Sequence, residues 1–298
     1  YYRQYGYAYA CDHWRRESLP AGRVPDRPAG SHIPWRFRDA TPADVPRLVE
    51  LYDQVMGRLD VCTVRSPAFW HFLLEREAYP VRVLEADGGG PAQGYIVTLP
   101  AGSAGSVLVA ESGITSRDAA LAALRLLKSE GASEIQLGWP ETSALVALGR
   151  SLGSTPVPSY QWLIRLTDLP ALLLKLAPVF AQRLAASDCA GLSANLVLNL
   201  FRRAYALDFE DGRLRAVRAL GFVDSSMGAD GGDLCIPPDA LVCLLMGYRT
   251  LDELRDAWPD IVIKPESRRV LDVLFPRLAS YLWMPYLYYG PVSLPATS

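Results

Sequence analysis

Apolar and polar residues alternate along the chain in a way that predicts a regular succession of strands and helices between residues 35 and 166. A short alternating run at residues 36–40 predicts a strand. Thr41-Pro42-Ala43-Asp44 then has the residue types of a helix start, with Thr before the helix and Pro in its first turn. An apolar face at helical spacing follows, formed by Val45, Leu48, Val49, Tyr52, Val55 and Met56.

The rest of this region continues in the same manner. Ser66-Pro67 opens a second, short helix, and three strands separated by Gly-rich turns are predicted at residues 81–86, 93–99 and 106–111. Ser116 begins a helix that stops before Gly131. A strand at 134–139, a helix at 141–152 and a strand at 160–166 complete the order β-α-α-β-β-β-α-β-α-β.

The pattern changes after residue 168. A continuous apolar face predicts one helix over 169–186, and three strands follow at 194–201, 203–209 and 213–220. The Asp211-Gly212 pair between the last two strands predicts a hairpin. Helices are predicted at 239–246, after Thr250 in a capping-box sequence, and at 266–274. This region is therefore expected to be an α+β domain.

The first 33 residues show neither of the patterns of strands and helices described above. Residues 1–18 are aromatic but too short to form a domain, and residues 19–33 have the Pro/Gly/Arg-rich composition of a linker. We expect the aromatic segment to pack against another part of the protein. The chain begins without Met, which leads us to expect that it is a piece of a longer protein whose earlier domain ends within residues 1–18.

Composition and charge argue against several classes of function. The chain has 298 residues, 30 Lys and Arg against 32 Asp and Glu, and a net charge of −2, so nucleic-acid binding is not expected. Five Cys without a C-x-x-C pair and three scattered His argue against a metal site or a disulfide framework and favour a cytoplasmic location. The uncharged stretch at 88–110 contains Pro and many Gly, so a membrane span is not expected.

The order of elements over residues 34–167 resembles the GNAT acetyltransferase fold. Residues 168–298 resemble the sterol-carrier-protein-like domain that follows GNAT domains in one subgroup, on the residues Pro237-Pro238-Asp239, Leu244–Thr250 and Leu274-Phe275-Pro276. The opening Tyr1–Tyr7 is similar to the Tyr-x-x-Phe-Gly-Tyr segment that closes the catalytic domain there. That subgroup is the bacterial enhanced-intracellular-survival type, which has an active GNAT domain, a degenerate one and the carrier-like domain.

The resemblance implies an N-acetyltransferase that moves an acetyl group from acetyl-CoA to an amine and forms homo-oligomers. It places the catalytic tyrosine at Tyr2, which would protonate the departing CoA thiolate. It also implies that the C-terminal carboxylate acts as a base, here on Ser298, although the ending of this chain lacks the aromatic residue of the family pattern.

The turn expected to hold the CoA diphosphate departs from the family pattern. GNAT proteins carry Gln/Arg-x-x-Gly-x-Gly/Ala there, whereas residues 109–118 keep one glycine and contain Glu111 and Asp118. A diphosphate site needs bare backbone N–H groups and little negative charge. We therefore expect no cofactor-binding residues in this chain, and an inactive chain when it stands alone.

The sequence also leaves alternative interpretations open for the aromatic tail and for the carrier-like region. The tail residues Trp283, Tyr286 and Tyr288 are expected either to pack between domains or to face an amine substrate through cation–π contacts. In the carrier-like region, an apolar or lipid-like ligand would need a cavity lined by Leu196, Leu198, Leu200, Tyr205, Leu207 and Phe209, although the same pattern would fill an ordinary core. A purely structural role as an oligomerisation platform is the third alternative.

Overall fold

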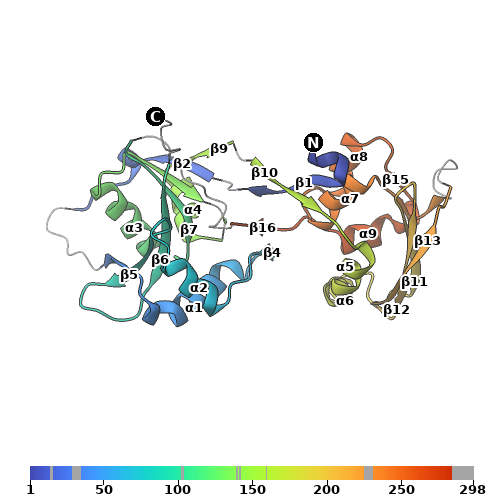
Figure 1. Ribbon diagram of the computed structural model, residues 1–298, viewed down its shortest axis with the longest axis horizontal. Coiled ribbons are helices and arrows are strands. Elements are labelled where there is room, and N and C mark those ends of the chain that lie inside the picture. Colours follow the sequence, from blue (N-terminus) through green and yellow to red (C-terminus); the bar gives the residue numbers. More distant parts are fainter. Residues whose placement is uncertain are drawn as a thin grey trace, which may run out of the picture. The chain divides into compact units, whose positions relative to one another are not determined.

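The computed structural model describes residues 1–13, 16–28, 35–101, 104–138, 140, 142–158, 160–224 and 231–283. The chain forms two compact units (Figure 1). Unit 1 comprises Tyr1–Cys11 and Gln161–Leu278, and unit 2 comprises Asp12–Tyr160 and Ala279–Ser298. Each unit is therefore assembled from two segments that are distant in the sequence.

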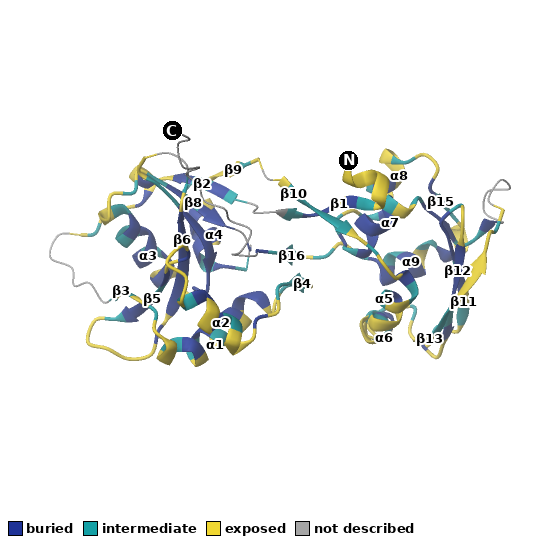
Figure 2. Ribbon diagram, viewed as in Figure 1, coloured by how far each residue is buried: buried dark blue, intermediate teal, exposed yellow. Residues whose placement is uncertain are grey.

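Unit 2 is built on a seven-stranded mixed sheet in the order β3-β5-β6-β7-β8-β2-β9. Its strands are β2 (Arg16–Pro20), β3 (Trp35–Asp39), β5 (Val81–Ala86), β6 (Gly94–Pro100), β7 (Ser106–Ser112), β8 (Glu134–Gly138) and β9 (Thr155–Val157). The pair β7 and β8 is parallel, and the other neighbours are antiparallel. The central strands are buried on both faces (Figure 2).

Two apolar cores cover the two faces of this sheet. Helices α1 (Val45–Met56) and α2 (Pro67–Leu74) share one core with Val83, Tyr95 and Val97. Helices α3 (Arg117–Ser129) and α4 (Ala144–Ser151) share the other with the intervening residues Leu84 and Ile96. This alternation is the consequence of the two-residue period of a strand. The mixed sheet and its flanking helices agree with the GNAT-like order predicted for this region.

The stretch expected to be a linker begins inside the fold instead. Strand β2 pairs with β8 and β9, and it is followed by a 3₁₀ helix at Ala21–Arg23. Leu19, Ala21 and Val24 are buried in the core beside α3. Pro20 is the last residue of β2, a position at which proline is tolerated because its missing N–H is not needed for the ladder. Pro20 and Gly22 therefore mark the turn after the strand and not an extended linker.

A small parallel pair, β4 (Val61–Cys62) with β16 (Ser280–Tyr281), completes unit 2. It brings residues 279–283, which lie near the end of the described chain, onto the core formed by α1 and α2. Tyr281 and Trp283 are both part of that core.

Unit 1 contains a five-stranded sheet in the order β13-β12-β11-β14-β15. The strands are β11 (Ala194–Asn199), β12 (Ala204–Glu210), β13 (Arg213–Gly221), β14 (Leu234–Cys235) and β15 (Val262–Ile263). Its helices are α5 (Leu169–Lys175), α6 (Ala177–Ala185), α7 (Pro238–Leu245), α8 (Leu251–Ala257) and α9 (Arg268–Leu274), with a 3₁₀ turn at Pro265–Ser267. The predicted hairpin is present: Asp211 and Gly212 both have positive φ, 48° and 70°, as a two-residue turn of this kind requires.

The single helix predicted over 169–186 is wrong. Two helices flank Leu176, which follows the last residue of α5 and precedes the first residue of α6. Pro178 lies in the first turn of α6, where its missing N–H is tolerated. The apolar face continues across the break, which is why periodicity alone did not reveal it.

The N-terminal residues pack partly, as expected. A 3₁₀ helix, η1 (Tyr2–Tyr5), leads into β1 (Tyr7–His13), which pairs with β10 (Tyr160–Arg165). Ala8 and Ala10 belong to the core of unit 1. Tyr1, Tyr2 and Tyr5 are exposed.

Candidate functional site

The turn between β7 and α3 in unit 2 is the place where the sequence predicted a degenerate diphosphate site. Two of its backbone N–H groups are already paired within the chain. Gly113 N donates to the Tyr95 carbonyl (3.0 Å), and Ile114 N donates to Ser112 Oγ (3.3 Å). Ser116 Oγ caps α3 by accepting from Ala119 N (3.2 Å). These donors are used to hold the turn itself.

A buried ion pair lies directly below this turn. Arg65 Nη1 and Nη2 each donate to one Glu111 carboxylate oxygen at 2.6 Å, and both side chains are 1% exposed. The Tyr95 hydroxyl donates to Glu111 Oε1 at 2.7 Å. This geometry is the bidentate arrangement that satisfies a carboxylate most completely.

Aromatic rings enclose the Arg65 guanidinium. Its central carbon lies 4.6 Å from the ring centre of Tyr52, 5.0 Å from that of Trp70 and 5.3 Å from that of Trp283. Cation–π attraction to these rings therefore adds to the ion pair.

The buried charges shift the ionisation of their neighbours. Burial opposes the charge on Arg65, but the adjacent Glu111 carboxylate outweighs that effect and raises the Arg65 pKa. Burial, together with the Glu111 charge, raises the pKa values of Tyr52, Tyr95 and Tyr281. The phenols of the cluster are thus neutral at neutral pH.

The structure changes the expected role of two residues in this turn. Glu111 was expected to place negative charge where a diphosphate would sit, but its carboxylate is in the core and is neutralised by Arg65. Gly113 is required by packing: a Cβ built there would lie 2.0 Å from Tyr95 Cε1. Asp118 is exposed in the first turn of α3, as its sequence position suggested.

Residues from the C-terminal end of the described chain close the end of β7. The parallel ladder between β7 and β8 ends at the pair Val109 and Leu137. The next carbonyl, that of Ala110, accepts a hydrogen bond from the Tyr281 hydroxyl. Trp283 packs edge-on against Tyr79, with ring centres 6.2 Å apart. The space beside the end of β7 is thus occupied by the protein's own side chains.

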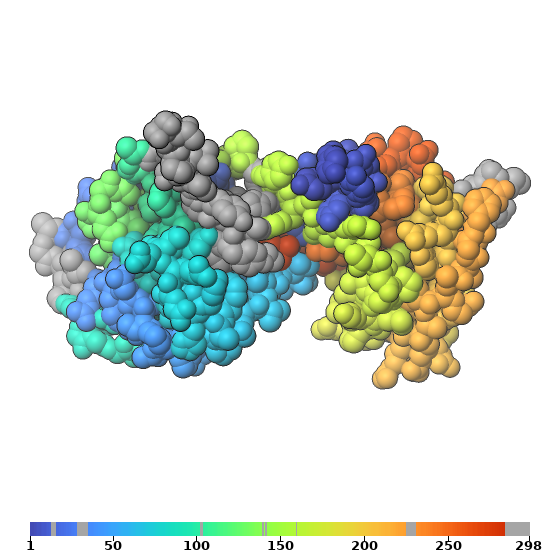
Figure 3. All heavy atoms as spheres, viewed as in Figure 1, coloured from blue at the N-terminus to red at the C-terminus, as the bar shows by residue number. Residues whose placement is uncertain are grey.

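The predicted site residues lie in different places. Tyr2 is 56% exposed in η1, its ring edge-on to Tyr1 and Tyr7, and the first residues of the chain form part of the surface of unit 1 (Figure 3). Trp283 is 1% exposed in the core of unit 2. Tyr286, Tyr288 and Ser298 lie outside the described residues. The structure therefore brings together Arg65, Glu111 and Tyr95, a set that the sequence did not single out.

The apolar strands of unit 1 form a core, and one of its edges opens into a cavity. Leu196, Leu198, Leu207 and Phe209 are buried in the core cluster. Leu200 and Tyr205 belong to the same cluster but also line a cavity of about 610 Å³. All six residues thus belong to the core, and two of them also line a cavity.

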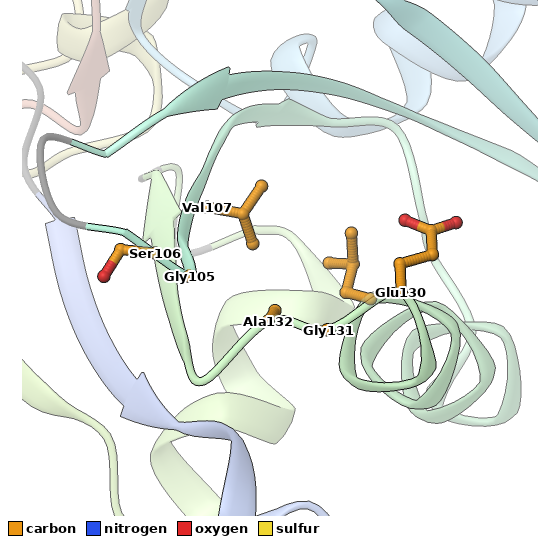
Figure 4. A pocket seen from close by; sticks show the side chains of 7 residues that line it. Gly105, Ser106, Val107, Glu130, Gly131 and Ala132 are labelled. Atoms are coloured by element: carbon orange, nitrogen blue, oxygen red, sulfur yellow. The ribbon is translucent and has the colours of Figure 1, made fainter.

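A smaller hollow of about 220 Å³ lies in unit 2, at the start of β7 (Figure 4). Its one charged lining residue, Glu130, is paired with Arg82 at 2.7 Å. The remaining lining consists of glycine, Ser106 and apolar side chains.

Metal-binding clusters and membrane-spanning helices are absent from the described ranges. No group of three or more His, Cys, Asp or Glu side chains is placed there to hold a metal ion. Among the helices described, none has the length and apolar character to cross a membrane.

Comparison with solved structures identifies the fold. A GCN5-related N-acetyltransferase from Anabaena variabilis is 16% identical, covers 94% of this chain and 69% of its own, and has a TM-score of 0.63. A conserved Enterococcus faecalis protein described as a probable N-acyltransferase is 15% identical, with coverage of 95% and 69% and a TM-score of 0.65. Eis1 from Mycobacterium abscessus is 19% identical, with coverage of 94% and 69% and a TM-score of 0.53.

This chain has the GNAT fold. Neither a protein-family profile nor a curated protein sequence matches it. At identities of 15–19% the likeness concerns the backbone. A shared fold does not imply a shared activity, so the function of this chain depends on the residues at its own sites.

Proposed function

We propose that this chain is part of a GNAT-type N-acetyltransferase that transfers an acetyl group from acetyl-CoA to an amine, and that the chain is inactive when it stands alone. The supporting observation is the turn after β7. The Arg65–Glu111 pair and the Tyr95 ring occupy the space next to this turn, in a chain whose fold is that of N-acetyltransferases. In this proposal unit 2 is a structural GNAT domain, unit 1 contains the sterol-carrier-like domain, and a further GNAT domain, to which residues 1–18 belong, holds acetyl-CoA.

Within that enzyme, Tyr2 would act at the leaving group. Acetyl-CoA supplies the activated acetyl thioester. When the acceptor amine forms its new bond to the acetyl carbon, the C–S bond breaks, and the Tyr2 hydroxyl gives its proton to the departing thiolate. The exposure of Tyr2 on the surface of unit 1 is compatible with this role, because a catalytic group must reach its substrate.

The other candidate site residues lie near the C-terminal end of the chain. The Ser298 carboxylate would act as the base that accepts a proton from the amine, and Tyr286 and Tyr288 would face the acceptor. Trp283 is left out of the acceptor site because its side chain is enclosed in unit 2. We also propose that the enzyme works in the cytoplasm as a homo-oligomer.

The first test is calorimetric titration of acetyl-CoA into the 298-residue chain. We expect no binding, since the N–H groups of Gly113 and Ile114 are already paired and Tyr95 packs against Gly113. A micromolar dissociation constant, equivalent to about −8 kcal/mol, would contradict the claim that this site is closed.

The second test concerns Tyr2 in the longer enzyme that the proposal requires. Tyr2→Phe should lower kcat by about 10²–10⁴-fold, the usual worth of a positioned general acid. Tyr1→Phe is the matched control, because Tyr1 is the neighbouring exposed tyrosine, and its activity should be near normal. Equal activities for the two variants would remove Tyr2 from the mechanism.

A second candidate function rests on a different observation. The cavity of about 610 Å³ in unit 1 is large enough for a small-molecule ligand, which favours the alternative of a binding module. The two functions are compatible, since one concerns unit 1 and the other a further domain.

A further inference from the structure

The cavity in unit 1 has an apolar floor. Leu200, Tyr205, Leu241 and Val242 line it and are all buried, while Tyr5 and Gly6 lie along its edge. Its volume of about 610 Å³ falls within the range of ligand pockets, roughly 300–1,000 Å³. An apolar group of several carbons would be removed from water on this floor.

The lining also carries two arginines, Arg165 and Arg203. Over the described ranges, neither guanidinium takes part in an ion pair or a hydrogen bond, and the Arg165 guanidinium lies 6.0 Å from the ring centre of Tyr7. Both arginines are exposed. Two guanidinium groups without carboxylate partners give this end of the cavity a positive potential.

The lining carries one acidic residue, Asp168, against these two arginines. Asp168 Oδ1 accepts a hydrogen bond from Ala171 N at 2.9 Å, which commits it to capping α5. An adjoining hollow of about 280 Å³ shares Arg165 and Asp168 and adds Lys175. Basic groups therefore outnumber acidic ones around the opening.

We propose that this cavity binds an amphiphilic organic anion. The anionic head group lies between Arg165 and Arg203, whose planar forks suit a carboxylate or a phosphate oxygen pair. The apolar part lies on Leu200, Tyr205, Leu241 and Val242. This inference does not depend on the acetyl-transfer proposal, because it concerns residues of unit 1 alone.

Titration of the 298-residue chain with decanoate tests the inference, at neutral pH and below the critical micelle concentration. We expect saturable binding that weakens with added salt. Decan-1-ol and decylammonium, which keep the chain and change the head group, should bind at least about tenfold more weakly. A parallel titration with decyl phosphate establishes which anionic head group is preferred, and saturable binding of either supports the site.

Two variants and a matched control locate the site. Arg165→Gln and Arg203→Gln should each weaken decanoate binding by about tenfold. Arg202→Gln should leave it unchanged, because Arg202 is exposed next to Arg203 but does not line the cavity. Circular dichroism and the melting temperature establish that each variant is folded.

Three outcomes would overturn the inference. One is the absence of saturable binding of both anionic probes. The second is equal affinity for decanoate and decylammonium, which would indicate non-specific partition of the apolar chain. The third is equal weakening by Arg202→Gln and Arg203→Gln, which would indicate attraction to the general surface charge. None of these outcomes would bear on whether another domain transfers acetyl groups.

Discussion

At the scale of single residues, the main feature of unit 2 is the buried Arg65–Glu111 ion pair. Two opposite charges are held in a core with aromatic rings around them, and Tyr95 adds a third hydrogen bond. Taking charges out of water is costly, and the cost is offset here by two short hydrogen bonds and cation–π contacts. Such a pair need not stabilise more than apolar side chains would, but removing one partner leaves the other charge buried and alone.

Glu111→Gln should therefore destabilise unit 2 by about 3–5 kcal/mol, measured by urea unfolding. Glu50→Gln is the control, because Glu50 pairs with Arg47 on the surface of α1 and should cost at most about 1 kcal/mol. The double variant Arg65→Met/Glu111→Leu should recover much of the loss. If Glu111→Gln were no worse than Glu50→Gln, the pair would not be a buried ionic contact.

At the scale of elements, the start of α1 joins a local signal to a distant strand. Asp44 accepts from Thr41 N (2.8 Å), as the sequence predicted for a helix start. It also receives Arg38 Nη1 and Nη2 from β3, each at 2.7 Å. The Arg38 hydrogen bonds, followed by that from Thr41, lower the Asp44 pKa to about 2 from 3.8. The carboxylate thus ties α1 to the edge of the sheet.

This shift predicts a pH dependence of stability. Because the folded-state pKa is below the unfolded one, the contribution of Asp44 is present above about pH 4 and is lost as the pH falls through about 2. Asp44→Asn should lower the free energy of unfolding by about 1–2 kcal/mol near neutrality, after allowance for the partial exposure of Arg38. The difference from the wild type should be small at pH 2, where the folded-state carboxyl is half protonated, and should vanish below that pH.

Asp39→Asn serves as the control for this experiment. Asp39 is the exposed last residue of β3, and its substitution should have little effect at any pH. A deficit for Asp44→Asn that persisted unchanged at pH 2 would mean that the carboxylate charge is not the source of the stabilisation.

At the scale of the whole molecule, each unit is completed by a segment from one end of the described chain. Ala8 and Ala10 join the core of unit 1, which is otherwise formed after residue 160. Tyr281 and Trp283 join the core of unit 2, which is otherwise formed before residue 161. The integrity of unit 2 therefore depends on residues more than a hundred positions away from the rest of it.

Truncation after Ser280 should consequently lower the melting temperature of unit 2. It removes Tyr281 and Trp283, and deletion of one large buried aromatic side chain typically costs about 3–5 kcal/mol. Truncation after Gly290, which lies outside the described residues, retains both and should leave the melting temperature near that of the full chain. Equal melting temperatures for the two truncations, measured by calorimetry, would show that the aromatic pair contributes nothing.

The sequence by itself determined the features whose cause is local. The helix starts at Thr41, Ser66 and Ser116 and the turn at Asp211-Gly212 follow from backbone groups a few residues apart. The order of strands and helices over 35–166 follows from apolar periodicity, which each element carries within itself. The resemblance to the GNAT fold rested on that order, and the solved structures agree with it.

Only the tertiary structure decided which distant residues meet. Strand β2 lies between β8 and β9, the Arg65 and Glu111 side chains join across 46 positions, and Tyr281 reaches Ala110 across 171. A lone arginine before a helix and a glutamate at a strand end carry no signal of their partner, because a charge looks the same in the sequence whether it is solvated or buried. Their pairing depends on which surfaces the whole chain packs together, and it is this packing that closed the turn after β7 and left a cavity in unit 1.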